Sequence, residues 1–212
     1  IYGLTKGQYS PTSKPGLKTP STPVGSVDRP LSATQFALGS GARFVARTVD
    51  VMQKHMPGVL KRAHEHAGAS FVEIFQNCIV YNDAVFSHFT DKAVASDAQV
   101  HVEHGKPLLF GKENNKGLRL NMSTLKLETV TIGKNGISES DILVHDETNH
   151  TLATMLTAME APEMPVALGV LYCNPAPTYD AEVTKQVEQF KAAKPNPDLN
   201  ALFREGHTWT IK

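Results

Sequence analysis

Residues 43–75 read RFVARTVDVMQKHMPGVLKRAHEHAGASFVEIF. Residues 43–49 alternate between two sides and include β-branched side chains, a pattern that is typical of a strand. Pro57 suits the first turn of a helix, and apolar residues follow it at helical spacing until Gly68. Residues 70–75 are almost continuously apolar, as in a buried parallel strand. A strand, a helix and a second strand of these lengths predict an α/β fold with a doubly wound sheet.

The segments before and after this core differ in their predicted secondary structure. A short helix over residues 32–38 precedes the first strand, in keeping with the α/β pattern. After Cys78 the sequence predicts an α+β extension with short antiparallel strands, joined by turns at residues 114–115 and 135–136. The elements expected in this extension are strands over residues 107–110, 118–122, 125–132 and 166–172, and helices over residues 148–159 and 181–193.

Composition excludes several classes of function. The chain has 212 residues, with 21 Lys plus Arg and 21 Asp plus Glu, so its formal net charge is zero. A protein that binds nucleic acid through counterion release needs a basic excess, which is missing here. The sequence contains no run of 18 apolar residues, so it predicts no membrane span. The two cysteines, Cys78 and Cys173, form neither a disulfide framework nor a zinc pattern, so we expect a cytoplasmic protein.

A proline-rich loop occupies residues 10–30 and holds five of the 13 prolines. Proline lacks a backbone donor and blocks helix formation, so this segment is expected to be irregular. Long loops between ordered elements are often functional, and we favour that interpretation. The chain opens at Ile1 directly in a loop-like sequence, and we therefore expect it to be the latter part of a longer polypeptide.

The first eight residues, IYGLTKGQ, combine two glycines, a hydroxyl, a cation and an amide in one bend. Glycine lets the backbone approach an anion closely, and the Thr5 hydroxyl can donate to a phosphate oxygen. Taken alone, so short a pattern is more often an ordinary surface turn. Residue types by themselves therefore leave both interpretations open.

Two motifs together carry a resemblance to a known family. IYGLTKGQ at residues 1–8, followed by SPT at 10–12, resembles the segment after the paired asparagines of a thiamine-diphosphate motif. FVART at 44–48, FVEIFQNC at 71–78 and YND at 81–83 resemble the same proteins, in the same order. The family is the β subunits of 2-oxoacid:ferredoxin oxidoreductases, and the sequence is most similar to its 2-oxoglutarate type.

The resemblance implies a role for the bend in binding thiamine diphosphate and Mg²⁺. The backbone carbonyl of Ile1 would be one oxygen ligand of Mg²⁺, an ion that requires near-octahedral oxygen coordination. Gly3, Thr5 and Gly7 would line the diphosphate, and Gln8 would support the turn. The Gly-Asp-Gly motif and the asparagine pair that complete this site in the family would precede Ile1.

Leu4 and Lys6 are the residues that the resemblance assigns to substrate selection. Pyruvate-type relatives have asparagine and glycine at these two positions. A dicarboxylic 2-oxoacid carries a second negative charge, which Lys6 could pair with, while Leu4 would form an apolar wall beside the substrate chain. The alternative for Lys6 is a solvated loop cation.

The resemblance also implies that Cys78 is one ligand of a [4Fe-4S] cluster, and a cluster of this kind needs four thiolates. The other three cysteines would lie upstream, so the isolated fragment should hold no cluster. The alternative for Cys78 is an ordinary buried thiol, and Cys173 is expected to be a core residue. The histidines in HEH at 64–66 and HVEH at 101–104 lack partners at a recognised metal spacing, and both groups are expected to be solvated.

The function that the resemblance implies is that of the β subunit of a 2-oxoglutarate:ferredoxin oxidoreductase. Such an enzyme converts 2-oxoglutarate and coenzyme A to succinyl-CoA and CO₂ and passes electrons through its cluster to ferredoxin. An α subunit would complete the enzyme as a heterodimer or larger assembly, and the isolated fragment should be inactive. Residues 1–83 would be the later half of the thiamine-diphosphate-binding domain, and residues 84–212 a C-terminal extension. One sheet edge would then be open and apolar.

Two alternatives remain open at this stage. The substrate could be pyruvate or another 2-oxoacid, or the chain could be a non-catalytic fragment that only binds a partner subunit.

Overall fold

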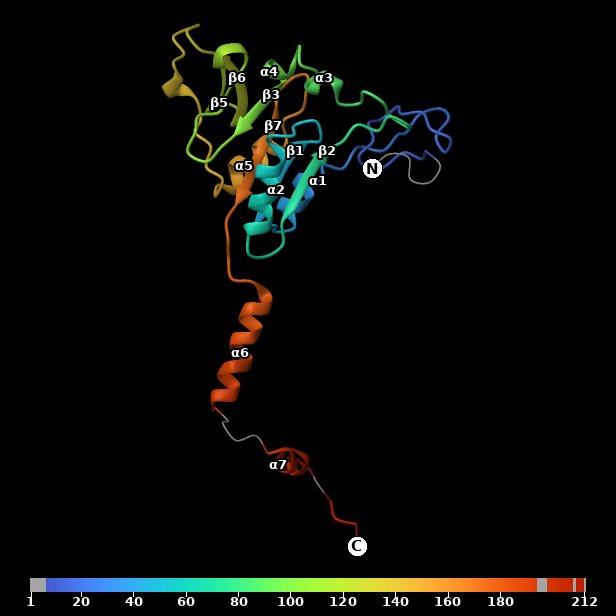
Figure 1. The fold of residues 1–212 in the computed structure, drawn as a ribbon, viewed down its shortest axis with the longest axis vertical. Coiled ribbons are helices and arrows are strands. Elements are labelled where there is room, and N and C mark those ends of the chain that lie inside the picture. Colours follow the sequence, from blue (N-terminus) through green and yellow to red (C-terminus); the bar gives the residue numbers. More distant parts are fainter. Residues whose placement is uncertain (1–6, 194–197, 208, 212) are drawn as a thin grey trace. The chain divides into compact units, whose positions relative to one another are not determined.

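The computed structural model describes residues 7–193, 198–207 and 209–211. The chain divides into two compact units, with the boundary between Ala176 and Pro177. In the first unit, two sheets are packed with short helices (Figure 1). The elements in chain order are α1 (Ala33–Gly39), β1 (Phe44–Val49), α2 (Met56–Glu65), β2 (Phe71–Phe75), α3 (Ser87–Thr90), α4 (Ala95–Ala98), β3 (Gln99–Val102), β4 (Leu109–Phe110), η1 (Lys112–Asn114), β5 (Lys116–Asn121), β6 (Lys126–Thr131), η2 (Glu139–Asp141), α5 (His150–Thr157), β7 (Val166–Cys173), α6 (Tyr179–Ala193) and α7 (Leu199–Arg204).

The larger sheet has four strands in the order β2-β1-β7-β3. β1 and β2 are parallel, β3 and β7 are parallel, and the central pair β1 and β7 is antiparallel. The α/β prediction is confirmed, but the sheet is mixed and not purely parallel. The antiparallel pairing arises because β7 arrives after the inserted small sheet and α5, and not through a single crossover helix.

Helices cover both faces of this sheet, and every residue of β1 and β7 is buried. On one face, Val45 packs with Leu38 of α1 and Ala153 of α5. The adjacent residue, Phe44, lies on the opposite face and packs with Val59 of α2. This alternation follows from the two-residue period of a strand. It explains why residues 43–49 are recognisable as a strand although none of β1 reaches solvent.

The smaller sheet, in the order β4-β5-β6, is antiparallel throughout. Its residues share a core with the larger sheet: Leu118 of β5 belongs to the same buried cluster as Val100 of β3 and Leu156 of α5. Asn135 and Gly136, which the sequence marks as a turn, both have positive φ angles, 53° and 75°. The three short antiparallel strands expected after Cys78 are therefore confirmed.

The elements that sequence analysis missed are the short ones. β3 has only four residues, and α3 and α4 are single turns. At these lengths a period of 2.0 or 3.6 residues hardly differs from chance, so pairing with β7 decides the state of β3. The predicted helices over residues 32–38, 148–159 and 181–193 correspond to α1, α5 and α6 within two residues at each end.

The larger sheet takes strands from both sides of residue 83. β1 and β2 precede that position, whereas β3 and β7 follow it. Residues on both sides of position 83, as far as Ala176, thus belong to one compact unit, and residue 83 as the limit of a cofactor-binding domain stays a prediction. In the described part of the chain, β2 pairs only with β1, and Ile74 on it is exposed, which matches the expected open, apolar edge.

The second unit contains α6 and α7, and neither helix has a buried residue. Apolar side chains, among them Phe190 and Phe203, are exposed on these helices. None of the helices that the structure describes has both the length and the apolar character needed to cross a membrane.

Candidate functional site

The candidate site lies where β1 and β2 end. Because these strands are parallel, their carboxyl ends meet at the same sheet edge, where open α/β sheets form binding sites. Asp50 directly follows β1, and Asn77 and Cys78 follow β2. The Asp50 amide donates to the Phe75 carbonyl at 3.0 Å, and the Asn77 amide donates to Asp50 Oδ2 at 3.3 Å. The ends of β1 and β2 are thus joined by hydrogen bonds immediately before Cys78 in the sequence.

The residues after Cys78 form a closed loop, which we call the Cys78 loop (residues 78–83). Its first carbonyl, that of Cys78, accepts a hydrogen bond from the Asn82 amide at 2.9 Å. The Asn77 side chain bridges the ends of the loop: Nδ2 donates to Asp83 Oδ1 at 2.8 Å, and Oδ1 accepts from the Ala84 amide at 2.9 Å. The loop is therefore held by its own polar groups.

The proline-rich segment is an ordered loop that folds back on itself. The Gly16 amide donates to the Ser26 carbonyl at 2.7 Å, and the Leu31 amide donates to the Pro11 carbonyl at 2.7 Å. The Ser26 hydroxyl donates to the Lys14 carbonyl at 2.9 Å. These bonds join the two halves of residues 10–31, so a segment without helix or strand nevertheless has one defined backbone path.

Gly7 connects the glycine-rich bend to the Cys78 loop. It is buried and has a φ angle of +76°. A Cβ atom on Gly7 would lie 3.1 Å from the ring of Tyr81 and 3.7 Å from Pro20. The loop that starts at Gly7 and the segment between β2 and α3 consequently lie side by side (Figure 1). A side chain at position 7 would both strain the backbone and push against Tyr81.

The structure thus places one predicted site residue, Gly7, beside the loop that begins with another, Cys78. Gln8 follows Gly7 and is half-buried. Ile1, Gly3, Leu4, Thr5 and Lys6 lie outside the described residues, and their roles stay predictions.

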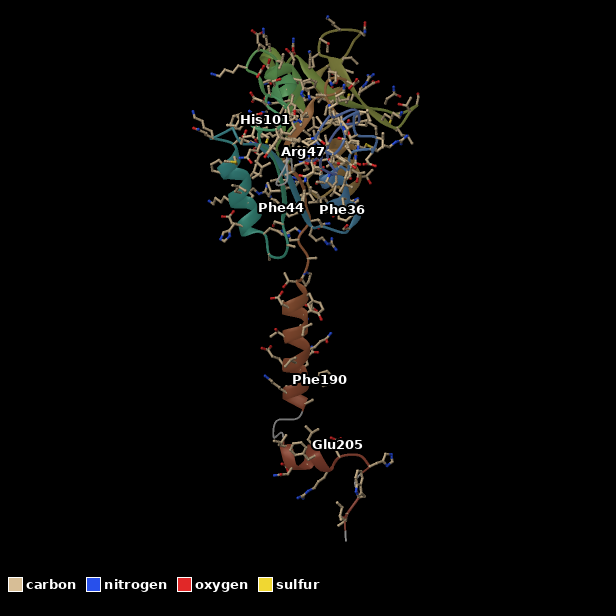
Figure 2. The ribbon with its side chains drawn as sticks, turned by 90° about the vertical axis from the view of Figure 1, so that its right-hand side faces the viewer. Phe36, Phe44, Arg47, His101, Phe190 and Glu205 are labelled. Atoms are coloured by element: carbon tan, nitrogen blue, oxygen red, sulfur yellow. The ribbon has the colours of Figure 1, made fainter. Side chains whose placement is uncertain are left out.

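A buried polar network beneath the site was missed by sequence analysis. Arg47 on β1 is paired in register with Glu73 on β2, and Arg47 Nε donates to Glu73 Oε2 at 2.7 Å. Arg47 Nη2 donates to the Thr34 hydroxyl of α1 at 2.8 Å. The guanidinium lies 5.4 Å from the ring centroid of Phe75, and Figure 2 labels Arg47 within the first unit. The only sequence signal is an arginine in an otherwise apolar strand, which requires a partner when buried.

Aromatic residues at the end of β2 and after it stabilise the same region. Phe75, Phe86 and Phe89 form a mutually contacting cluster with ring centroids 4.9 to 5.8 Å apart. Tilted and edge-on contacts of this kind each stabilise by about 0.5–1.5 kcal/mol beyond the area that they bury. The cluster fixes the end of β2 and the return of the chain after the Cys78 loop.

The two cysteines have different surroundings. Cys78 is a free, half-buried thiol, so it fits the requirement for one accessible thiolate ligand of a cluster. Cys173 is buried and pairs with Phe44, at the opposite end of β1 from Asp50, about 20 Å away along the strand. Burial raises the pKa of the Cys173 thiol. The prediction that Cys173 is a core residue is confirmed, and it cannot share a cluster with Cys78.

No group of three or more His, Cys, Asp or Glu side chains among the described residues could hold a metal ion. The expectation that both histidine groups are solvated is wrong in part. The ring of His66 packs against Phe44 with centroids 5.4 Å apart, and His66 Nδ1 is buried. His101 stands edge-on to His55 at 5.2 Å. Desolvation lowers the pKa of both His55 and His101. The expectation is thus wrong for His66, whose ring contributes to packing, whereas His64, His101 and His104 are exposed as expected.

His145 should make stability depend on pH. Its side chain is only 1% exposed, and its Nε2 lies 2.9 Å from the Val170 carbonyl. Burial lowers the pKa of His145, although the hydrogen bond to Val170 acts in the opposite direction. The His145 side chain therefore remains neutral in the native state, whereas in the unfolded chain it takes up a proton near pH 6.5. We expect stability to be complete above that pH and to fall by up to about 1.4 kcal/mol per pH unit below it, until the native pKa is reached.

The measurement is the urea midpoint of unfolding at pH 7.5 and pH 5.5. His145→Leu removes the titrating group and should reduce the difference between the two midpoints. His64→Leu, at an exposed position, is the control and should leave the difference as in the unmodified protein. An unchanged difference in the His145→Leu variant would show that His145 is not the source.

Comparisons with known proteins extend the resemblance over the whole chain. No family model matches. A 2-oxoglutarate oxidoreductase subunit named KorB from Mycobacterium tuberculosis is 37% identical over 216 residues, which covers all of this chain and 57% of that protein. The β subunit of a 2-oxoacid:ferredoxin oxidoreductase from Saccharolobus solfataricus is 39% identical over 94 residues, covering 44% of this chain and 31% of the relative. The resemblance predicted from the sequence is confirmed.

A solved structure shows the same fold. It is a 2-oxoglutarate:ferredoxin oxidoreductase from Magnetococcus marinus, determined with 2-oxoglutarate, coenzyme A and succinyl-CoA bound. The superposition has a TM-score of 0.64 at 24% sequence identity and covers 98% of this chain and 55% of that chain. The chain thus spans a little over half the length of both full-length relatives.

Proposed function

We propose that this chain, which resembles the β subunits of 2-oxoacid:ferredoxin oxidoreductases from end to end, is part of such a subunit and serves the oxidation of 2-oxoglutarate. The observation that carries the proposal is the similarity to KorB, which includes every part of the chain and not only its motifs. The reaction would convert 2-oxoglutarate and coenzyme A to succinyl-CoA and CO₂, with ferredoxin as electron acceptor and an α subunit as partner.

The bend at residues 1–8 would bind the cofactor diphosphate. Thiamine diphosphate, when bound with Mg²⁺, supplies the electron sink that decarboxylation of a 2-oxoacid requires. In this proposal Gly3, Thr5 and Gly7 line the diphosphate, the Ile1 carbonyl contributes one oxygen to Mg²⁺, and Gln8 supports the bend. The positive φ angle of Gly7 and its contact with Tyr81 support a tight backbone at the end of this bend.

Cys78 would supply one of the four thiolates of a [4Fe-4S] cluster. Its place supports this role: the thiol is half-buried, it lies at the carboxyl edge of the sheet, and its loop contacts Gly7. Gly7, at the described end of the bend, thus lies beside the Cys78 loop, and closeness of this kind is what electron transfer between a cofactor and a cluster requires. The three remaining thiolates would come from outside this chain.

Lys6 would select 2-oxoglutarate by pairing with its distal carboxylate, beside the apolar wall formed by Leu4. Replacing it tests the proposed substrate. In the full-length subunit with its α partner, we expect Lys6→Gly to lower kcat/KM for 2-oxoglutarate relative to pyruvate by about 10- to 100-fold, since a hydrogen bond to a charged group contributes about 1.5–3 kcal/mol. The measurement is ferredoxin reduction with each acid in the presence of coenzyme A.

The matched control is Lys18→Gly, which removes an exposed cation from the neighbouring loop and should leave the ratio unchanged. If Lys6→Gly also leaves the ratio unchanged, pyruvate or another 2-oxoacid becomes the better substrate assignment. If the unmodified holoenzyme fails to reduce ferredoxin with any 2-oxoacid, the alternative of a non-catalytic fragment that only binds a partner subunit is favoured.

A further inference from the structure

The Cys78 loop lacks the packing that normally fixes a loop. Ile79 and Val80 are 77% and 73% exposed, and the loop contains neither helix nor regular strand. Exposed side chains of this kind contribute little to holding a backbone in place, so the conformation depends on hydrogen bonds. The residue that makes most of these bonds lies just outside the loop.

Asn77 uses its backbone and both ends of its side chain. Its amide donates to Asp50 Oδ2 at 3.3 Å, which connects it to the end of β1. Its Nδ2 donates to Asp83 Oδ1 at 2.8 Å, and its Oδ1 accepts from the Ala84 amide at 2.9 Å. One side chain thus ties the first residue before the loop to the last residue of the loop and to the first residue after it.

The backbone at Ala84 shows that this closure is costly. Ala84 has a φ angle of 55°, in the left-handed region that residues with a Cβ atom seldom adopt. A conformation of this kind costs about 1–2 kcal/mol and persists where its surroundings enforce it. The Ala84 amide is held by two acceptors, Asn77 Oδ1 and Asp83 Oδ1, both at 2.9 Å. Asn77 therefore contributes directly to a strained turn that ends the Cys78 loop.

We infer that Asn77 is a positioning residue: by closing the Cys78 loop and tying it to β1, it holds the Cys78 thiol in one orientation toward the iron–sulfur cluster. The inference rests on the proposed function. A metal centre bound by a flexible ligand loses iron easily, because the ligand must be ordered again each time it dissociates. Loss of a group that orients a metal ligand typically costs about 10- to 100-fold in metal affinity.

The test compares Asn77→Ala with Asn82→Ala in the full-length subunit with its α partner. The two variants make the same change, one just before the loop and one inside it. No hydrogen bond of the Asn82 side chain occurs among the described residues, and its backbone bond to Cys78 would remain. We expect iron release to a chelator to be about 10- to 100-fold faster in Asn77→Ala, with a broadened electron paramagnetic resonance signal of the reduced cluster, and to be unchanged in Asn82→Ala.

A third variant distinguishes positioning from loss of an asparagine. The double substitution Asn77→Asp with Asp83→Asn exchanges donor and acceptor, so the hydrogen bond across the loop can form again while the Ala84 amide keeps an acceptor. It should restore slow iron release, whereas Asn77→Asp alone, which faces Asp83 with a like charge, should not.

The thermal midpoint of each variant is measured alongside iron release. Fast release without a lowered midpoint supports the inference, and fast release that merely follows global unfolding overturns it. Wild-type rates and spectra in Asn77→Ala also overturn it, but leave the proposed function intact. If the unmodified holoenzyme contains no iron, the proposed function is overturned, and this inference with it.

Discussion

Replacing Cys78 by alanine in the full-length subunit should remove the iron–sulfur cluster and, with it, the reduction of ferredoxin. A [4Fe-4S] cluster requires four ligands, and a methyl group cannot replace a thiolate. The other cysteine of the sequence, Cys173, lies beside the opposite end of β1 and cannot replace Cys78 as a ligand. The measurements are iron and acid-labile sulfide per subunit and the rate of ferredoxin reduction, which should fall to background.

Cys173→Ser provides the matched control for this experiment. It also removes a cysteine, but from a buried position in β7, at the opposite end of the sheet from the Cys78 loop. It should retain iron and electron transfer, with some loss of stability. If the Cys78→Ala protein keeps its iron and reduces ferredoxin at the normal rate, Cys78 has no part in the cluster and that element of the proposed function is removed.

The second large effect concerns folding. Gly169→Ala should destabilise the protein by about 3–5 kcal/mol, or prevent folding, because two costs combine at one position. Gly169 lies in the central strand β7 with a φ angle of 130°, which side chains rarely adopt. A Cβ atom there would lie 2.5 Å from the Val102 carbonyl oxygen of β3. That neighbour is backbone, so it cannot move aside without breaking the β3–β7 pairing.

Gly58→Ala is the control for the glycine substitution. Gly58 is in α2, has no positive φ angle, and a Cβ atom there meets no atom within 4 Å. Alanine at this position should stabilise by about 0.5–1 kcal/mol, through higher helix propensity and a less flexible unfolded chain. Equilibrium unfolding in urea measures both changes, and a Gly169→Ala protein as stable as the unmodified chain would contradict the argument.

Long elements with a clear period were predictable from local sequence. β1, α2 and β2 follow from alternation, from Pro57 and from a continuous apolar run, and α5 follows from its apolar face. β3 was not predictable, because four residues carry too little pattern and its state is decided by pairing with β7. The antiparallel pairing of β1 with β7 was equally invisible, since more than 100 residues separate the two strands.

The candidate site divides in the same way. Gly7 and Cys78 were singled out by motif, because their chemistry is carried by the residue type itself. Arg47 and Asn77 were not, because the roles of both side chains depend on partners brought to them by the fold. An arginine or asparagine has many possible partners, and only the structure shows which one lies within 3 Å.

Local sequence was enough to identify the family resemblance, the α/β class and the two motifs, since each depends on residues that are close along the chain. The juxtaposition of Gly7 with Tyr81, the network around Arg47 and the closure of the Cys78 loop by Asn77 came only from the folded chain. The physical reason is that the fold brings together residues such as Gly7 and Tyr81, or Arg47 and Glu73, that are tens of positions apart, and no local pattern records such contacts. The bonds of Asn77 to Asp83 and Ala84 are short in sequence, but which of the many possible partners an asparagine takes is decided by the backbone path of the loop.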